Sequence, residues 1–294
     1  MEEEQKKNWY ELHYKHLLIL PIILILASII YLVQFSAEHG DLILKDVSLT
    51  GGTTITVFDE FANINNLRDA LSIDFPDLII RGISNIQTGK QQGFFVETSA
   101  EVDQIRTALE EYLSYSLNAE NSSIEFSGAS LSEGFYQQLK IAILIAFVFM
   151  AIVVFLVFRT PIPSLAVIIS AFADIIMTLA VINLAGFRLS NAGIIALLML
   201  IGYSVDTDIL LTTRLLKTKQ GSLNKKMTDT LKTGLTMTLT SIVATATALI
   251  IIYNLSDVLR QMFTILIIGL GFDLFNTWIT NASILRWYVE AKHI

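Results

Sequence analysis

Residues 189–214 read LSNAGIIALLMLIGYSVDTDILLTTR, an apolar stretch interrupted near its end by Asp206 and Asp208. Residues 189–211 are enough to cross a bilayer core of about 30 Å as an α-helix rising about 1.5 Å per residue. Carboxylates inside a membrane are costly unless they are protonated, hydrated or paired, and they usually mark ion or proton pathways. The stretch therefore predicts a membrane-spanning helix that carries a polar functional site.

Similar apolar stretches occur elsewhere in the chain. They cover residues 17–33, 141–158, 165–184, 235–255 and 262–285. The composition agrees, since 53% of the 294 residues are hydrophobic and 16% are charged, whereas a soluble domain is about a quarter charged. The first stretch is longer than the hydrophobic region of most signal peptides, which favours an uncleaved anchor. The sequence predicts an α-helical polytopic membrane protein with six transmembrane helices.

Acidic residues concentrate between the first and second apolar stretches. Residues 37–138 hold 16 acidic and 5 basic residues, a net charge of −11 within a total of −7. Such a segment repels nucleic acid, which we exclude as a partner. The chain therefore divides into segments 1–16, 17–35 (first transmembrane helix), 36–138 (extracytoplasmic domain), 139–285 (transmembrane helices two to six) and 286–294.

The loop between the fourth and fifth stretches sets the expected orientation. Residues 212–234 contain six Lys or Arg residues and a single acid, Asp229. Short loops rich in Lys and Arg stay cytoplasmic. Both termini are therefore expected in the cytoplasm, with the acidic domain outside a multi-pass protein of the cell membrane.

The acidic segment has the pattern strand, helix, strand, strand, helix, strand. Expected strands cover residues 53–58, 78–83, 94–98 and 123–126, and expected helices cover 63–72 and 102–117. This βαββαβ order predicts an α+β ferredoxin-like sandwich between the first and second transmembrane helices, because right-handed crossovers leave few other topologies.

Four carboxylates lie within the predicted spans: Asp174, Asp206, Asp208 and Asp273. They are candidates for proton relay and transport, with structural hydrogen bonding between helices as the alternative. Asp206 and Asp208 are about 200° apart around a helix, so they cannot share one face. Ser204 and Thr212 lie in line with Asp208 and could hydrate or hydrogen-bond it.

Gly202 lies in line with Asp206 and would let a neighbouring helix approach closely. The fifth stretch is rich in hydroxyl groups, which could line a wet path beside the acids. Hydrogen bonds to the helix's own carbonyl groups explain these residues equally well. They are Thr236, Thr238, Thr240, Ser241, Thr245 and Thr247.

Three segments resemble the SecF family of the SecD/SecF protein-export complex, which is related to the resistance-nodulation-division (RND) transporters. They are residues 46–53 (DVSLTGGT), 173–175 (ADI) and 201–214 (IGYSVDTDILLTTR). The positions that carry this resemblance are Gly51, Gly52, Asp174, Gly202, Tyr203, Ser204 and Arg214. Bacterial members typically read Asn-Asp-Thr where this chain has Asp206-Thr207-Asp208, and this form looks more like archaeal members.

The resemblance implies an accessory subunit of the Sec machinery that assists polypeptide export, coupled to the proton motive force. Implied partners are a SecD-like subunit, the Sec translocon (SecY/SecE), the translocating unfolded polypeptide and membrane lipid. No cofactor is expected, because the chain has no Cys and its four His residues form no metal motif.

Three rival functions remain at this point, one of which is a purely structural scaffold whose buried aspartates serve only assembly. An intramembrane aspartyl protease would need a Gly-x-Gly-Asp motif, which residues 269–273 (GLGFD) miss by one position. We therefore expect no enzymatic activity. An RND-type small-molecule or lipid efflux half-transporter is the stronger alternative, although such transporters usually have twelve helices in one chain.

Overall fold

The computed structural model describes residues 9–85, 88–217, 222–253 and 256–292. Lys219 of the basic loop and His293 lie outside the described residues. Six helices are long and apolar enough to cross a membrane, as predicted. They are α2 (Ile19–His39), α6 (Ala129–Phe158), α7 (Pro161–Leu184), α8 (Asn191–Lys217), α9 (Leu223–Ile252) and a sixth formed by α10 (Asp257–Phe275), η1 (Asn276–Asn281) and α11 (Ala282–Lys292).

The helix ends follow local sequence signals. α2 ends at Gly40, which adopts φ 77° and donates its amide to Ser36, as expected for a glycine cap. Pro161 opens α7, where its missing N–H costs nothing. Ser222 caps α9 by accepting a hydrogen bond from the Lys225 amide. A short helix, α1 (Trp9–Leu17), precedes α2 and was not expected from the sequence.

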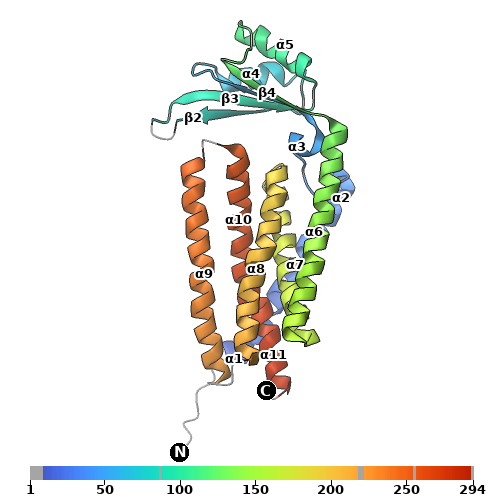
Figure 1. Ribbon diagram of the computed structural model, residues 1–294, viewed down its shortest axis with the longest axis vertical. Coiled ribbons are helices and arrows are strands. Elements are labelled where there is room, and N and C mark those ends of the chain that lie inside the picture. The colour runs from blue at the N-terminus through green and yellow to red at the C-terminus, as the bar shows by residue number, and fades with distance from the viewer. Residues whose placement is uncertain (1–8, 86–87, 218–221, 254–255, 293–294) are drawn as a thin grey trace, which may run out of the picture.

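α7 and α8 form the centre of the helical bundle and are its most buried helices, whereas α9 is the least buried (Figure 1). α7 and α8 contribute apolar side chains to the core of the bundle, including Val167, Leu197 and Leu200. Gly269 lets α10 approach α8, because a Cβ there would lie 2.3 Å from Leu200 Cδ2. Asp174 of α7 and Asp208 of α8 consequently lie in the protein interior.

A small domain lies between α2 and α6 in the sequence. It contains β1 (Gly52–Val57), α4 (Ile64–Leu71), β2 (Ile79–Ser84), β3 (Gln91–Thr98), α5 (Val102–Leu113) and β4 (Ser122–Ser127). The strands form one antiparallel sheet in the order β2-β3-β1-β4. α5 ends four residues before the predicted boundary, because Ser114 adopts φ 61° and turns the chain back.

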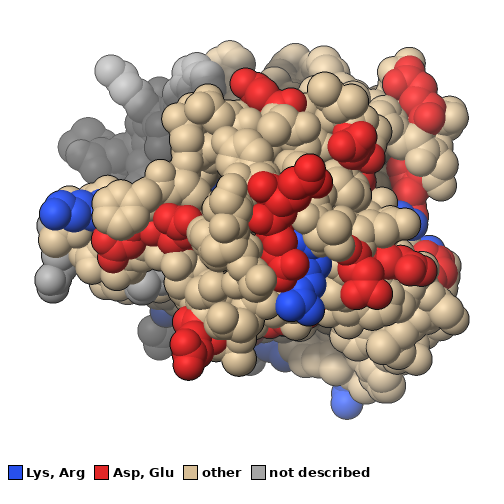
Figure 2. Space-filling model, turned by 90° about the horizontal axis from the view of Figure 1, so that it is seen from above, with Lys and Arg blue, Asp and Glu red and all other residues tan. Residues whose placement is uncertain are grey.

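The two faces of the sheet differ. α4 and α5 cover one face around a core that includes Ile55, Phe94 and Leu109. The other face is turned toward the ends of the membrane helices that lie nearest the small domain (Figure 1). Thr54 lies on that face, paired with Glu97 on one side and Glu125 on the other. Acidic side chains outnumber basic ones on the pole seen from above (Figure 2).

The small domain joins the bundle through two chain segments that cross at a glycine pair. Gly51 has φ +84°, and a Cβ there would lie 2.4 Å from Ala129 Cα at the start of α6. Gly52 has φ +141°, and its Cβ would lie 2.3 Å from the Thr98 carbonyl oxygen. Only glycine fits at either position. The pair therefore lets the segment that enters the small domain pack closely against the segment that leaves it.

Candidate functional site

Three of the four predicted aspartates meet inside the bundle. Asp174 of α7, Asp208 of α8 and Asp273 of α10 are all 0% exposed. Asp273 lies close enough to the other two carboxyl groups to interact with both electrostatically. We call these three residues the carboxyl cluster.

Asp174 receives a hydrogen bond on each carboxyl oxygen. The Ser204 hydroxyl donates to Oδ2 at 2.6 Å, and the Asn276 side-chain amide donates to Oδ1 at 2.7 Å. The Asn276 amide oxygen in turn accepts a hydrogen bond of 3.0 Å from Thr280. Every polar atom of this arrangement therefore has a partner.

The two carboxyl oxygens of Asp208 differ in their hydrogen bonds. Its Oδ1 accepts from Asn281 Nδ2 at 2.7 Å, Thr277 Oγ1 at 2.9 Å and Ser170 Oγ at 3.4 Å. Among the described residues, its Oδ2 has no hydrogen-bond partner. Thr277 also reaches Asp273 Oδ1, at 3.2 Å, and so links the carboxyl groups of α8 and α10.

A π-helical turn positions the amide groups. Asn276 and Asn281 begin and end η1, and both point into the carboxyl cluster. In a regular α-helix, five residues rotate about 500°, which would leave these two side chains about 140° apart. The wider π turn brings them to nearly the same face, and such turns are frequent at functional sites. The sequence interpretation missed both residues, although four polar residues in an apolar stretch (Asn276, Thr277, Thr280, Asn281) were a usable signal.

Asp206 lies apart from the carboxyl cluster. It is exposed on α8, together with Gly202, Tyr203 and Arg214 of the same motif. The prediction that Asp206 and Asp208 occupy different faces is therefore confirmed. Gly202 has no neighbour within 4 Å of the position of a Cβ, so the space beside it is open among the described residues.

The expected hydroxyl partners of Asp208 were wrong in detail. Ser204 bonds the carboxyl group of Asp174 instead, and Thr212 Oγ1 donates to the backbone oxygen of Asp208 at 2.8 Å. Asp174 lies on the neighbouring helix α7, so the Ser204 side chain points across the interface between α7 and α8. Ser170, from α7, supplies a hydroxyl to Asp208 in its place.

Most hydroxyl groups of α9 bond their own helix. Thr236, Thr240, Thr245 and Thr247 donate to the carbonyl oxygen four residues earlier, at 2.6–2.8 Å. Thr238 differs, since it is buried and its hydroxyl contacts the Asp273 carboxyl group. α9 therefore contributes one side chain to the carboxyl cluster.

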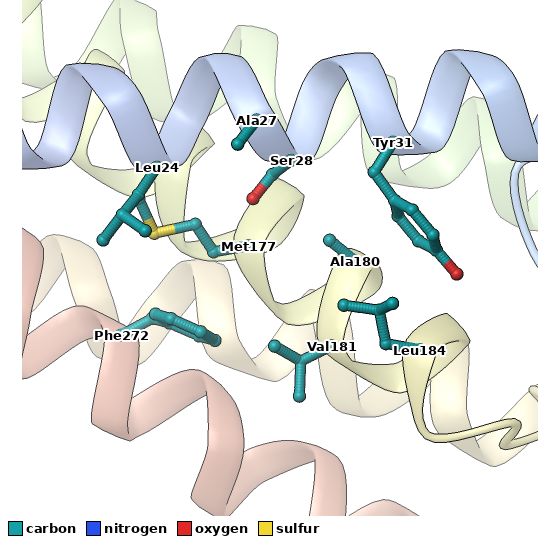
Figure 3. Close-up of a pocket in the computed structure, with 9 residues that line it drawn as sticks. All are labelled: Leu24, Ala27, Ser28, Tyr31, Met177, Ala180, Val181, Leu184 and Phe272. Atoms are coloured by element: carbon teal, nitrogen blue, oxygen red, sulfur yellow. The ribbon is translucent and has the colours of Figure 1, made fainter.

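An apolar pocket lies beside the carboxyl cluster. It has a volume of about 340 Å³ and is bordered by α2, α7 and α10 (Figure 3). Ser28 and Tyr31 supply its hydroxyl groups, and no carboxylate lines it. Met177 lines the pocket and receives a weak hydrogen bond of 3.6 Å from Asn276, whose amide also bonds Asp174.

The hydrogen bonds that hold the carboxyl cluster come from hydroxyl and amide groups rather than from cations. In the described parts of α7, α8 and α10, no Lys or Arg lies beside these three carboxyl groups. No set of three or more His, Cys, Asp or Glu residues is spaced for a metal ion within the described chain. Buried, hydrogen-bonded carboxyl groups of this kind can hold and exchange protons.

The N-terminal end of α8 is hydrogen-bonded to the segment that leads into the small domain. Leu189 donates its amide to the Leu44 carbonyl at 2.6 Å, and Asp46 donates its amide to the Leu189 carbonyl at 3.0 Å. The Asn191 amide donates to the Ser48 hydroxyl at 3.2 Å. The helix that carries Asp208 is thus joined directly to the base of the small domain.

Known proteins are similar to this chain in sequence and in fold. The family model for "Protein export membrane protein SecD/SecF, C-terminal" matches residues 107–291. The protein-export membrane protein SecF of Methanocaldococcus jannaschii is 40% identical over 285 residues, covering 94% of this chain and 96% of that protein. SecF of Pyrococcus furiosus is 36% identical over 296 residues, covering 99% of this chain and 96% of that protein.

Two crystal structures of SecDF have a similar fold. SecDF from Thermus thermophilus, described as a translocon-associated membrane protein, matches with a TM-score of 0.73 and 19% identity over 98% of this chain. A SecDF structure in a super-membrane-facing form matches with a TM-score of 0.60 and 19% identity over 96% of this chain. This chain covers 40% and 39% of those two chains, respectively.

The six apolar helices and these relatives identify a multi-pass membrane protein with a mostly helical fold. The family model matches more than half of the chain, and the Methanocaldococcus relative is aligned over nearly its whole length. This chain therefore belongs to the SecD/SecF family of protein-export membrane proteins.

Proposed function

We propose that the chain is an accessory subunit of the Sec machinery that assists polypeptide export across the cytoplasmic membrane, driven by the proton motive force. The curated relatives are protein-export proteins, which favours this function over small-molecule or lipid efflux. No enzymatic step is part of the proposal.

One observation carries the proposal: α8 bears Asp208 at the carboxyl cluster and is hydrogen-bonded at its N-terminal end to the base of the small domain. A change in protonation alters which hydrogen bonds the cluster can form, and so the packing of α8 against α7 and η1. The small domain is fastened to that helix and would move with it. Moving one proton through the membrane potential supplies about 2.3 kcal/mol per 100 mV.

The proposed topology follows the charge distribution. Residues 1–16 and 286–294 lie in the cytoplasm, residues 17–35 and 139–285 contain the spans, and residues 36–138 form the extracytoplasmic domain. The βαββαβ order and the sheet order β2-β3-β1-β4 support a ferredoxin-like assignment for that domain. Single cysteines replacing Lys90 and Lys225, in a chain without native Cys, should react from opposite sides of the membrane; reaction from one side would overturn this topology.

The proposed partners are a SecD-like subunit, the SecY/SecE translocon, the unfolded polypeptide in transit and membrane lipid. The SecD-like subunit is supported by the SecDF structures, in which this chain matches less than half of a longer polypeptide. Transporter sites usually lie at the interface of two repeats, and this chain supplies one set of six helices.

The proposed relay comprises Asp174, Asp208 and Asp273 in the carboxyl cluster, and Asp206 on the partner-facing surface. In cells that depend on this chain, Asp174→Asn and Asp208→Asn should each slow export at least about tenfold, equivalent to about 1.4 kcal/mol of activation free energy. Asp229→Asn, in the exposed cytoplasmic part of α9, is the control and should export normally. Protein levels should match in all variants.

Normal export by a triple variant with Asn at positions 174, 206 and 208 would reject proton coupling and leave a structural role for these residues. Proton flux into vesicles containing the chain and its SecD-like partner gives the direct measurement. That flux should disappear in Asp208→Asn.

A further inference from the structure

Two buried acceptor atoms beside the carboxyl cluster lack a donor. Among the described residues, Asp208 Oδ2 and Asn281 Oδ1 form no hydrogen bond, although both side chains are 0% exposed. Their two groups already touch, since Asn281 Nδ2 donates to Asp208 Oδ1 at 2.7 Å. Leaving a buried polar atom unpaired costs about 1–3 kcal/mol, so two such atoms on adjacent groups require an explanation.

Asn276 and Asp174 provide the internal comparison. In that pair both carboxyl oxygens accept a hydrogen bond, and the amide oxygen accepts one from Thr280. The arrangement suits an ionised carboxylate, which can only accept. In the Asp208 pair, one carboxyl oxygen has three donors while the other carboxyl oxygen and the amide oxygen have none.

A single proton would give both unpaired atoms, Asp208 Oδ2 and Asn281 Oδ1, a hydrogen-bond partner. A protonated carboxyl group has one O–H donor, and an Asn amide has both an acceptor and donors. With the proton on Asp208 Oδ2, this O–H can donate to Asn281 Oδ1 while Asn281 Nδ2 donates to Asp208 Oδ1. The two groups then form a closed ring of two hydrogen bonds.

We infer that Asp208 and Asn281 form an acid–amide pair that holds a proton on Asp208 Oδ2, with Asn281 as the positioning residue. The inference rests on the proposed proton coupling and names the group that stores the proton. Loading forms one O–H bond at Oδ2 and one hydrogen bond to Asn281, with the proton taken from a hydronium ion that leaves as water. Release breaks both and leaves a carboxylate that keeps three donors on Oδ1.

The surroundings favour the neutral acid. The titratable groups that face Asp208 are Asp273 on α10 and Asp174 on α7, and both would repel a second negative charge. η1 contributes only amide and hydroxyl groups to this site. Arg286, the buried cation of α11, is bonded to Glu290 at 2.8 Å.

Infrared spectroscopy of the full chain, reconstituted in vesicles with its SecD-like partner, tests the pair. A protonated aspartic acid gives a carbonyl band separate from those of ionised carboxylates. Near neutral pH, wild type should show such a band that is lost in Asp208→Asn. In Asn281→Leu the band should move to higher frequency, because the acid loses both hydrogen bonds to the amide. Asn183→Leu is the matched control: this buried amide bonds the Leu42 carbonyl away from the carboxyl cluster, and its removal should leave the band in place.

Two results would overturn the inference. The first is a wild-type spectrum in which Asp208 contributes only ionised carboxylate bands. The second is a band that stays in place in Asn281→Leu but shifts in Asp273→Asn. Asp273 Oδ2 also lacks a donor among the described residues, and it would then be the acceptor of the Asp208 O–H. If Asn281→Leu does not fold, the difference spectrum of wild type and Asp208→Asn still gives the first result, and Asn281→Ala, which removes the amide without adding bulk, replaces it for the second.

Failure of this inference differs from failure of the proposed function. If Asp208→Asn abolishes proton flux while the wild-type carboxyl group is ionised, proton coupling stands and the acid–amide pair is rejected. If flux survives Asp208→Asn while the band responds to Asn281→Leu, the pair stands and the proposed proton relay through Asp208 is rejected.

Discussion

Each aspartate of the carboxyl cluster is held by hydroxyl and amide groups. Ser204 and Asn276 bond Asp174, whereas Thr277 and Asn281 bond Asp208. Neutral donors stabilise a carboxylate less firmly than an Arg or Lys would, and a carboxyl group paired with a cation resists protonation. A site built from neutral donors can therefore exchange a proton without breaking a salt bridge.

Removing the Ser204 hydroxyl should disturb the carboxyl cluster, because this hydroxyl bonds Asp174 and also contacts the Asp273 carboxyl group. Ser204→Ala deletes the 2.6 Å hydrogen bond to Asp174 Oδ2 and leaves a buried acceptor unpaired, a loss of about 1–3 kcal/mol. Thermal unfolding should report the lower stability, and export should slow. Thr212→Val is the control, because that buried hydroxyl bonds only its own helix. Equal effects of the two variants would contradict a specific role for Ser204.

The glycine pair should be intolerant of any side chain. Gly51→Ala forces a Cβ to 2.4 Å from Ala129 Cα at φ +84°, so a steric clash adds to backbone strain of about 1–2 kcal/mol. Gly89 has φ +66° and open space where a Cβ would lie, so Gly89→Ala measures the backbone strain without a steric clash. We expect Gly51→Ala to destabilise the chain by at least about 1 kcal/mol more than Gly89→Ala, measured by thermal unfolding. Equal losses would show that the close crossing is not required.

At the scale of elements, the sequence predicted every membrane helix and strand, because hydrophobic length and alternation are local properties. It could not predict that Asn276 and Asn281 share a site. Their spacing of five residues places them on different faces of a regular helix, and only the π turn of η1 brings them together. The separation of Asp206 from Asp208 was predictable, since it follows from helical geometry alone.

Tertiary contacts decided the remaining differences. Ser204 bonds Asp174 rather than Asp208 because the packing of α8 on α7 sets which carboxyl group it meets. Likewise, α5 ends early because Arg106 donates to the Leu117 carbonyl at 2.8 Å and Glu110 accepts from the Leu117 amide at 2.8 Å, which fixes a return turn. Neither contact is visible in a periodic pattern.

The small domain should lose stability in acid through Asp77. Burial alone would raise the pKa of Asp77, but hydrogen bonds from the Ser99 amide, at 2.6 Å, and the Thr98 hydroxyl, at 3.0 Å, hold it below its ordinary value. A lowered pKa in the folded state stabilises the fold above the unfolded pKa of about 3.9, and this contribution disappears as the pH falls through the folded pKa.

Asp77→Asn should therefore lower the stability of the small domain at pH 7 by about 1 kcal/mol, the value of one lost hydrogen bond. The difference from wild type should shrink as the pH falls below about 4. Hydrogen exchange of the strand amides in the full chain measures both quantities. Asp69→Asn, an exposed substitution on α4, should change neither. A deficit of Asp77→Asn that persists unchanged in acid would contradict the assignment.

For the whole molecule, the exposed face of α8 and α9 requires a protein partner. Asp206 is exposed on α8, yet a charged side chain facing lipid near the middle of a membrane helix costs about 2.5–3.5 kcal/mol. Gly202, one turn away, leaves room for a second helix to approach. α9 alongside is the least buried span, with Thr236 and Thr240 exposed. A second set of six helices would cover this face and remove Asp206 from lipid.

Gentle detergent extraction should therefore recover a one-to-one complex of this chain with a SecD-like subunit. A single cysteine at Gly202, in a chain without native Cys, should cross-link to a helix of that partner. Ile30→Cys is the matched control: it is exposed on α2, away from α8 and α9, and should react only with lipid-soluble reagents. Because Asp206 is stable in the membrane only under such cover, Asp206→Leu should weaken the complex without destabilising the isolated chain. Recovery of active monomers or homodimers, with no cross-link from position 202, would contradict the paired assembly.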